Sequence, residues 1–300
     1  MLKVPLNLQL AVKEKLSQHL NINGNFLINI ATCPAINLKS QIMLVQITNA
    51  CNYNCPHCLH NSTINGGHMS IEVFKKALQF LSYIGQKTLV ISGGEPFYNP
   101  NWFEMIKLIP KDVKFHICSN GSFITNPITM RFIDILTKGF SNLVEIQVTT
   151  HPDLYPSTFI STIKHLNEFD SIPKVRFYVG DIWIKDLGRA RGNYNSFIDN
   201  AKYYAPSCYN GHIIARQSPS PKWFGAILEE KFPCHPLIDY LGYIHLSESW
   251  LCPNQGNIMD YPFDIIWEKI KSSKPCNKCY NAVVFNKKYP MRNEINKILK

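Results

Sequence analysis

The chain has 300 residues and a mass of 34.4 kDa, which is enough for one large domain or two small ones. Hydrophobic residues make up 45% of it and charged residues 17%, and this composition excludes an intrinsically disordered chain. The net charge of +10 fits an anionic partner or a generally basic surface. Because no run of five or more Lys or Arg residues occurs, charge alone selects no function.

The first 40 residues predict an N-terminal extension with a short amphipathic helix near 12–20. They lack the continuous apolar segment of a signal peptide, and no apolar run in the chain is long enough to cross a bilayer. The 10 cysteines are too dilute for a disulfide scaffold. We therefore expect a cytoplasmic protein with reduced thiols and no membrane partner.

Strand-like and helix-like segments alternate from residue 41 to residue 191. Short apolar, β-branched runs predict strands at 42–48, 88–91, 113–118, 143–149 and 174–179. Apolar residues at helical spacing predict helices at 71–81, 102–109, 128–136 and 159–169, the first of them capped by Ser70. This order predicts an α/β fold with a parallel sheet, curved or closed like a barrel, and with helices outside. In such folds the chemistry lies where the strands end.

The alternation stops near Arg191. Beyond it come many prolines and five of the ten cysteines, so we place a domain boundary near 192–207. The expected organisation is an N-terminal extension at 1–40, a core at 41–200 and a C-terminal domain at 201–300.

Three cysteines follow the first predicted strand with the spacing C-x3-C-x2-C: Cys51, Cys55 and Cys58. Three thiolates on one loop predict a metal centre that has a distant fourth ligand or one open position. A zinc site completed by His57 or His60 is the alternative.

Several motifs in this order resemble the radical S-adenosylmethionine (radical SAM) superfamily. The loop at 51–58 has the cysteine spacing of that family, and His57 stands where the family commonly has an aromatic ring. Four further segments resemble the family's GGEP, TNG, SLD and GRA motifs: Gly93-Gly94-Glu95-Pro96, Ser119-Asn120-Gly121, Thr149-Thr150-His151 and Gly188-Arg189-Ala190. The SLD match is partial, because Thr149 replaces Ser and His151 replaces Asp. The resemblance spans about residues 41 to 191 and implies a partial (β/α)6 TIM-like barrel.

The resemblance also implies roles for these residues. Cys51, Cys55 and Cys58 are expected to hold three irons of a 4Fe-4S cluster, whose fourth iron binds S-adenosyl-L-methionine (SAM). Reduction would then cleave SAM to a 5′-deoxyadenosyl radical that abstracts hydrogen from a substrate. The resemblance implies that SAM is bound by His57 near the adenine, Gly93 and Gly94 through close backbone approach, Glu95 at the amino group, Arg189 at the carboxylate, and Ser119. Asn120 and Thr149 are expected at the ribose or carboxylate, with a strand-end cap as the equal alternative for each. For Arg189, a solvated loop charge is the equal alternative.

A second set of cysteines lies in the C-terminal domain: Cys234, Cys252, Cys276 and Cys279. With Gly256-Asn257-Ile258 and Ile266-Trp267 between them, this set resembles SPASM/twitch extensions, which carry an auxiliary iron–sulfur cluster, here expected to be 4Fe-4S. Ser247 stands where that pattern has Gly. A zinc site with four cysteine ligands is the alternative.

The resemblance favours a radical SAM enzyme that modifies a peptide or protein and receives electrons from a donor such as flavodoxin or ferredoxin. The alternatives are a radical SAM enzyme for a small molecule or nucleotide, and a non-catalytic zinc protein that binds nucleic acid. We do not expect nucleic acid as the partner. One departure concerns the barrel, because only five strands precede Arg189, and a sixth is expected later, near 212–216.

Overall fold

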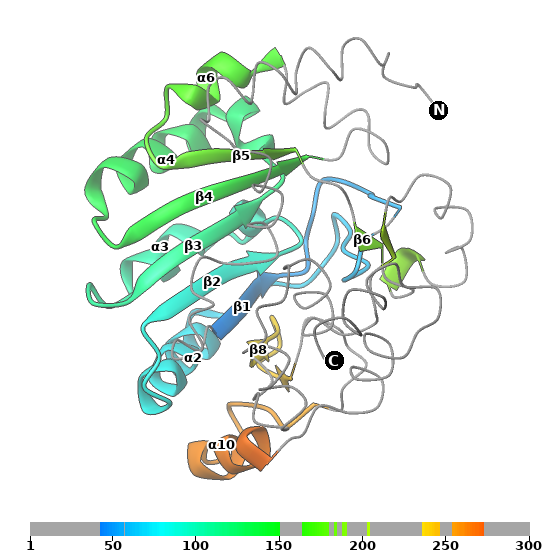
Figure 1. Ribbon diagram of the computed structural model, residues 1–300, viewed down its shortest axis with the longest axis vertical. Helices are drawn as coiled ribbons and strands as arrows, with labels where there is room; N and C mark the ends of the chain where they lie inside the picture. Colours follow the sequence, from blue (N-terminus) through cyan, green and yellow to red (C-terminus); the bar gives the residue numbers. More distant parts are fainter. Residues whose placement is uncertain are drawn as a thin grey trace, which may run out of the picture.

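The computed structural model describes residues 43–56, 58–150, 164–179, 183–184, 188–190, 203–204, 236–246 and 254–272. Its main feature is a sheet with the strand order β5-β4-β3-β2-β1-β8-β9 (Figure 1). The five large strands are β1 (Met43–Thr48), β2 (Thr88–Gly93), β3 (Lys114–Ser119), β4 (Leu143–Thr150) and β5 (Val175–Val179). Each pairs in parallel with the next.

Four helices connect these strands: α2 (Ile71–Tyr83), α3 (Trp102–Lys107), α4 (Pro127–Gly139) and α6 (Leu166–Asp170). They lie together beside the sheet in Figure 1. Right-handed crossovers between adjacent parallel strands place successive helices on the same face. The carboxyl ends of all five strands consequently lie at one edge, where the loops between β1 and α2 and beyond β2 and β3 meet.

Local sequence explains where these elements begin. The Ser70 side chain accepts a hydrogen bond from Val73 N at 3.2 Å, which confirms the predicted cap of α2. The Asn126 side chain caps α4, and Pro127 takes the first helical position. Strand β5 begins one residue later than predicted because Lys174 has a φ of 61°, which is incompatible with extended backbone.

The two faces of the sheet differ. Met43, Val45 and Ile47 of β1 belong to the large apolar core. Leu44, between them, packs with Val90 and Leu237 in a separate small cluster. Since side chains alternate along a strand, the even-numbered residues of β1 lie on the face away from that core.

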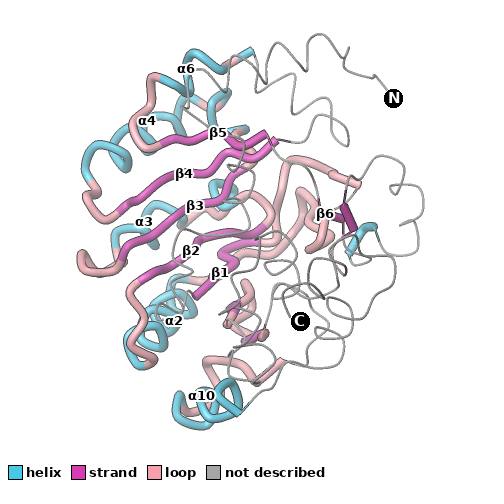
Figure 2. Tube along the Cα trace, in the orientation of Figure 1, coloured by secondary structure: helices cyan, strands magenta, loops and turns pink. Residues whose placement is uncertain are grey.

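The C-terminal segment returns to the β1 edge of the sheet. Strand β8 (Leu237–Ile238) pairs in parallel with β1, and β9 (Ile244–His245) pairs antiparallel with β8. Helix α10 (Phe263–Ser272) lies below α2 in Figure 2, and the Phe263 ring is 5.4 Å from that of Phe80. The ammonium of Lys76 lies 4.9 Å from the centre of the same ring. The segment is therefore anchored to both the first strand and the first helix.

The α/β fold with a parallel sheet is confirmed, and the first five strands lie within two residues of their predicted positions. A short strand before Arg189 was not predicted: β6 (Trp183–Ile184) pairs with β7 (Tyr203–Tyr204) in a separate sheet. The expected strand near 212–216 and the N-terminal extension lie outside the described residues. Within the described part of the chain, no helix has the length and apolar character needed to span a membrane.

Candidate active site

The cysteine loop begins where β1 ends. Its entry is fixed by two backbone hydrogen bonds, from Asn49 N to Gly67 O at 2.7 Å and from Cys51 N to Thr63 O at 2.9 Å. The loop therefore folds back on itself, and all three of its cysteines are free thiols. In Figure 2 it extends beyond the carboxyl ends of the strands on the side of β6.

Two of the three sulfur atoms accept backbone hydrogen bonds. Tyr53 N lies 3.4 Å from Cys51 Sγ, and Ser62 N lies 3.3 Å from Cys58 Sγ. Such bonds favour the thiolate form and fix the direction in which each sulfur points. The loop thus orients its sulfurs with its own backbone.

Burial opposes ionisation of two thiols of the loop, Cys51 and Cys55. It raises the pKa of Cys51 to about 11 and that of Cys55 to about 12, and negative charge on neighbouring groups adds to the effect. Three thiolates here therefore need a positively charged group among them, as an iron–sulfur cluster provides. Among the described residues no three His, Cys, Asp or Glu side chains form a group that holds one metal ion. A cubane needs no such convergence, because each thiolate binds a different iron. The donor set fits that cluster.

Glu95 is the buried acid of the site. It follows β2 and is 0% exposed. Its carboxylate accepts hydrogen bonds from Ser119 Oγ at 2.9 Å, Asn120 N at 2.7 Å and Phe97 N at 3.4 Å. Burial nevertheless raises the pKa of Glu95 to about 7, although these donors act in the opposite direction. Protonated and ionised forms are therefore close in free energy near neutral pH.

Asn120 connects this acid to the cysteine loop. Its backbone N–H binds Glu95, while its side-chain Nδ2 lies 3.7 Å from Cys51 Sγ and 2.9 Å from Asn52 Oδ1. The ends of β1, β2 and β3 are thus joined in one hydrogen-bonded group. The hydroxyl of Ser119, expected at the cofactor, donates to Glu95 and accepts from Gly121 N at 3.0 Å.

Gly93 and Gly94 were expected to let the backbone approach a ligand, but here they let it approach the protein itself. A Cβ at Gly93, whose φ is +151°, would lie 2.4 Å from Thr48 O, and one at Gly94 would lie 2.3 Å from Ala50 O. Gly94 N and Glu95 N donate to those two carbonyls at 2.9 and 2.8 Å. The glycines hold β2 against the start of the cysteine loop.

Arg189 binds the backbone of the cysteine loop through hydrogen bonds. It lies in the short helix η4 (Gly188–Ala190), and its guanidinium donates to Cys55 O at 2.6 Å and to Ser62 O. Its backbone N–H donates to Cys58 O at 3.0 Å. The expected pairing with the SAM carboxylate stays a prediction. The contacts to the loop backbone are a role that spacing could not reveal.

The remaining predicted residues divide into two groups. Thr149 lies near the end of β4, opposite Tyr178 of β5, and so at the same edge as the site. His57 and the second cysteine set lie outside the described residues: Cys234, Cys252, Cys276 and Cys279. Sequence reasoning missed Asn52, Asn49 and Ser62, since polar loop residues carry no signal of their own until their partners are known.

Comparison with known families identifies this part of the chain. Residues 45–168 match the family model of the radical SAM superfamily. The match covers about two fifths of the chain, and the matched segment contains all three cysteines of the loop together with Glu95 and Asn120.

Two curated proteins are similar over part of the chain. The AdoMet-dependent heme synthase of Methanosarcina barkeri is 30% identical over 83 residues, which are 27% of this chain and 24% of that protein. The antilisterial bacteriocin subtilosin biosynthesis protein AlbA of Bacillus subtilis is 37% identical over 81 residues, which are 26% of this chain and 18% of that protein. The chain thus matches less than a quarter of the length of either relative.

A solved structure shares the fold. SuiB of Streptococcus suis bound to S-adenosylmethionine aligns with a TM-score of 0.51 and 13% identity, covering 78% of this chain and 68% of that chain. A second SuiB structure, bound to its precursor peptide SuiA, has the same TM-score and identity and covers 67% of that chain. These alignments confirm the fold class expected from the motifs.

Proposed function

We propose that the protein is a radical SAM enzyme that modifies a peptide. The proposal rests chiefly on one contact, between the Asn120 side chain and Cys51 Sγ at 3.7 Å, made by a residue whose backbone also binds Glu95. Three motifs that are far apart in sequence meet there. A structural zinc site needs its ligands alone and has no use for a buried acid next to them.

The chain's own residues have separate tasks in this proposal. Cys51, Cys55 and Cys58 hold the cluster. When bound, the 4Fe-4S cluster and SAM supply reductive cleavage of a carbon–sulfur bond and a primary carbon radical. Glu95 accepts a hydrogen bond from the amino group of SAM, whose positive charge would draw the pKa of Glu95 back down.

Peptide modification is favoured by two of the relatives. AlbA takes part in the biosynthesis of a bacteriocin, and SuiB binds a precursor peptide. The similarity to a heme synthase supports a second candidate, an enzyme that acts on a small molecule.

Two further components belong to the proposal. The second cysteine set would bind an auxiliary 4Fe-4S cluster, as in SPASM/twitch extensions: Cys234, Cys252, Cys276 and Cys279. A low-potential donor in the cytoplasm, such as flavodoxin or ferredoxin, would supply the electron.

The test is anaerobic reconstitution with iron and sulfide, followed by incubation with SAM and dithionite. We expect 5′-deoxyadenosine, measured by liquid chromatography and mass spectrometry. A preparation that retains only zinc and forms no 5′-deoxyadenosine would contradict the enzyme. Co-expression with a candidate precursor peptide and mass measurement of that peptide then tests the substrate class.

A further inference from the structure

Asn52 lies in the cysteine loop, directly after Cys51, and its side chain binds the loop that follows β3. Asn120 Nδ2 donates to Asn52 Oδ1 at 2.9 Å, and Ser122 Oγ donates to the same oxygen at 3.3 Å. Asn120 Nδ2 also lies 3.7 Å from Cys51 Sγ. One amide group therefore contacts both a candidate cluster ligand and the residue next to it.

A backbone donor fixes which way the two amides point. Ser122 N donates to the side-chain Oδ1 of Asn120 at 2.9 Å, and a backbone N–H can act only as a donor. The side-chain oxygen of Asn120 therefore faces Ser122, and its Nδ2 faces Asn52 and Cys51. Because an amide nitrogen only donates, Asn52 in turn has to present its oxygen. Exchanging oxygen and nitrogen in either side chain would place two donors against each other.

Asn120 is also held through its backbone. Its N–H donates to the carboxylate of Glu95 at 2.7 Å. The next residue, Gly121, has a φ of +80°, and a Cβ there would lie 2.6 Å from Val148 Cγ1. The fold thus fixes where the Asn120 side chain begins. Rotation of the amide is the freedom that remains, and the contacts with Asn52 and Ser122 restrict it.

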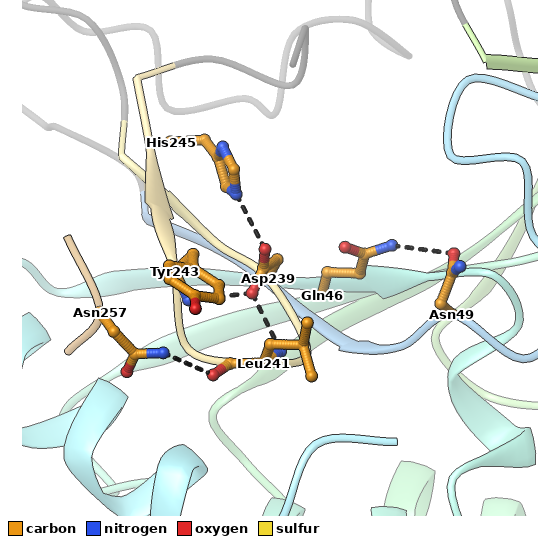
Figure 3. A network of polar contacts seen from close by, with 7 residues as sticks. All are labelled: Gln46, Asn49, Asp239, Leu241, Tyr243, His245 and Asn257. Carbon is orange, nitrogen blue, oxygen red and sulfur yellow. Dashed lines mark hydrogen bonds and ion pairs between the residues drawn. The ribbon is translucent and has the colours of Figure 1, made fainter. Parts of the chain in front are cut away.

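The contact at Cys58 shows how this arrangement differs from an ordinary loop hydrogen bond. Ser62 donates to Cys58 Sγ through its backbone N–H, and its hydroxyl donates to Asn49 Oδ1 at 2.8 Å. Figure 3 shows Asn49 beside Gln46, whose Nε2 lies 3.5 Å from that oxygen. These side chains hold the loop in place, but the donor at the sulfur belongs to the backbone. At Cys51 a side chain from another loop supplies a donor, and its direction depends on its own partners.

A hydrogen bond to a cluster sulfur acts differently on the two oxidation states of the cluster. One-electron reduction adds one negative charge, and a donor N–H stabilises the more negative state, so hydrogen bonds to the sulfurs help to set the reduction potential. The Nδ2 group of Asn120 has two hydrogens. Asn52 accepts one of them and thereby directs the other towards Cys51 Sγ.

We propose that Asn52 is a positioning residue that raises the reduction potential of the cluster by holding the Asn120 amide against Cys51. The inference rests on the proposed function, since it requires an iron–sulfur cluster at the cysteine loop. It gives this loop a second task, because a residue between two ligands then tunes the group that the ligands hold.

The test is a redox titration of the reconstituted full-length protein without SAM, followed by electron paramagnetic resonance of the reduced cluster. Asn52→Leu removes the acceptor at similar side-chain volume. It should lower the equilibrium constant for one-electron reduction about tenfold, which is a shift of about 59 mV to more negative potential. Asn54→Leu makes the same change at an exposed position of the same loop and should leave the potential unchanged.

A double-mutant cycle shows whether Asn52 acts through Asn120. Asn120→Ala should shift the potential in the same direction, and adding Asn52→Leu to it should cause no further shift, because the amide to be oriented is gone. Ser122→Ala, a milder change that removes the weaker donor to Asn52 and keeps the backbone donor, should cause a smaller shift. An equal effect of Asn52→Leu with and without the Asn120 side chain would overturn the proposal.

Iron content separates positioning from folding. If Asn52→Leu bound no iron while Asn54→Leu bound the wild-type amount, Asn52 would be a structural residue of the loop and the proposal would be wrong. An unchanged or more positive potential in Asn52→Leu would also contradict it. Failure of the proposed function is read separately, from the absence of 5′-deoxyadenosine when the wild-type protein is incubated with SAM and dithionite.

Discussion

The two cysteine sets of this chain differ in their spacing along the sequence. Cys51, Cys55 and Cys58 share one short loop, and contacts from β2, β3 and η4 hold that loop in place. The second set is spread over more than forty residues of sequence. The described C-terminal elements β8, β9 and α10 pack against β1 and α2. The first site is thus held by contacts from neighbouring elements of the fold, whereas the second set lies outside the described residues.

The largest expected effect comes from removing cysteines of one set at a time. Replacing Cys51, Cys55 or Cys58 by Ala should lower 5′-deoxyadenosine formation at least about a hundredfold, because three thiolates leave no spare ligand. Cys276→Ala with Cys279→Ala should lower the iron content yet preserve SAM cleavage. Cys118→Ala, which changes a cysteine of β3 outside the loop, is the control. Iron analysis and product assays measure both effects, and identical behaviour of the two sets would refute the division of roles.

A smaller effect is expected from changing Arg189, whose guanidinium donates hydrogen bonds to the backbone of the cysteine loop. Arg189→Gln removes two charge-assisted hydrogen bonds to the loop backbone and should weaken cluster assembly about tenfold. Arg189→Lys keeps the positive charge but loses the forked arrangement of guanidinium donors. It should therefore retain part of the cluster assembly that Arg189→Gln loses. Exposed Arg176→Gln is the matched control. Electron paramagnetic resonance intensity at limiting iron reports the change. Normal assembly combined with a raised KM for SAM would instead indicate direct binding of SAM.

The last effect is on the stability of the cluster-free protein and concerns its dependence on pH. The pKa of Glu95 rises from 4.5 to about 7 on folding, so its stabilising contribution is complete below pH 4.5 and is lost as pH rises through 7. The resulting decrease in the free energy of unfolding is at most about 3 kcal/mol. Glu95→Gln should abolish this slope, and exposed Glu104→Gln should keep it. Anaerobic urea unfolding at several pH values measures it, and a stability that rises over this range would contradict the raised pKa.

Local signals predicted the fold well where local chemistry sets the structure. The cap at Ser70 and the runs of β-branched residues placed α2 and the first five strands. Strand β8 escaped because Leu237–Ile238 is too short for a periodic signal, and its partner Leu44 is nearly two hundred residues away. For the same reason the sequence predicted roles for Arg189 and Gly93 at the cofactor but not the backbone atoms that they contact.

The distance in sequence between Arg189 and its loop also has a consequence for synthesis. The guanidinium of Arg189 reaches back 134 residues to Cys55. A ribosome that adds 5–20 residues per second needs roughly 7 to 27 seconds to cover that interval. During this time the three thiols of the loop have been synthesised, but Arg189, which binds the loop backbone, has not. The order of synthesis therefore exposes these thiols to oxidants and adventitious metals before the loop is held in place. Delivery of the cluster after translation would meet a loop that Arg189 already holds in place.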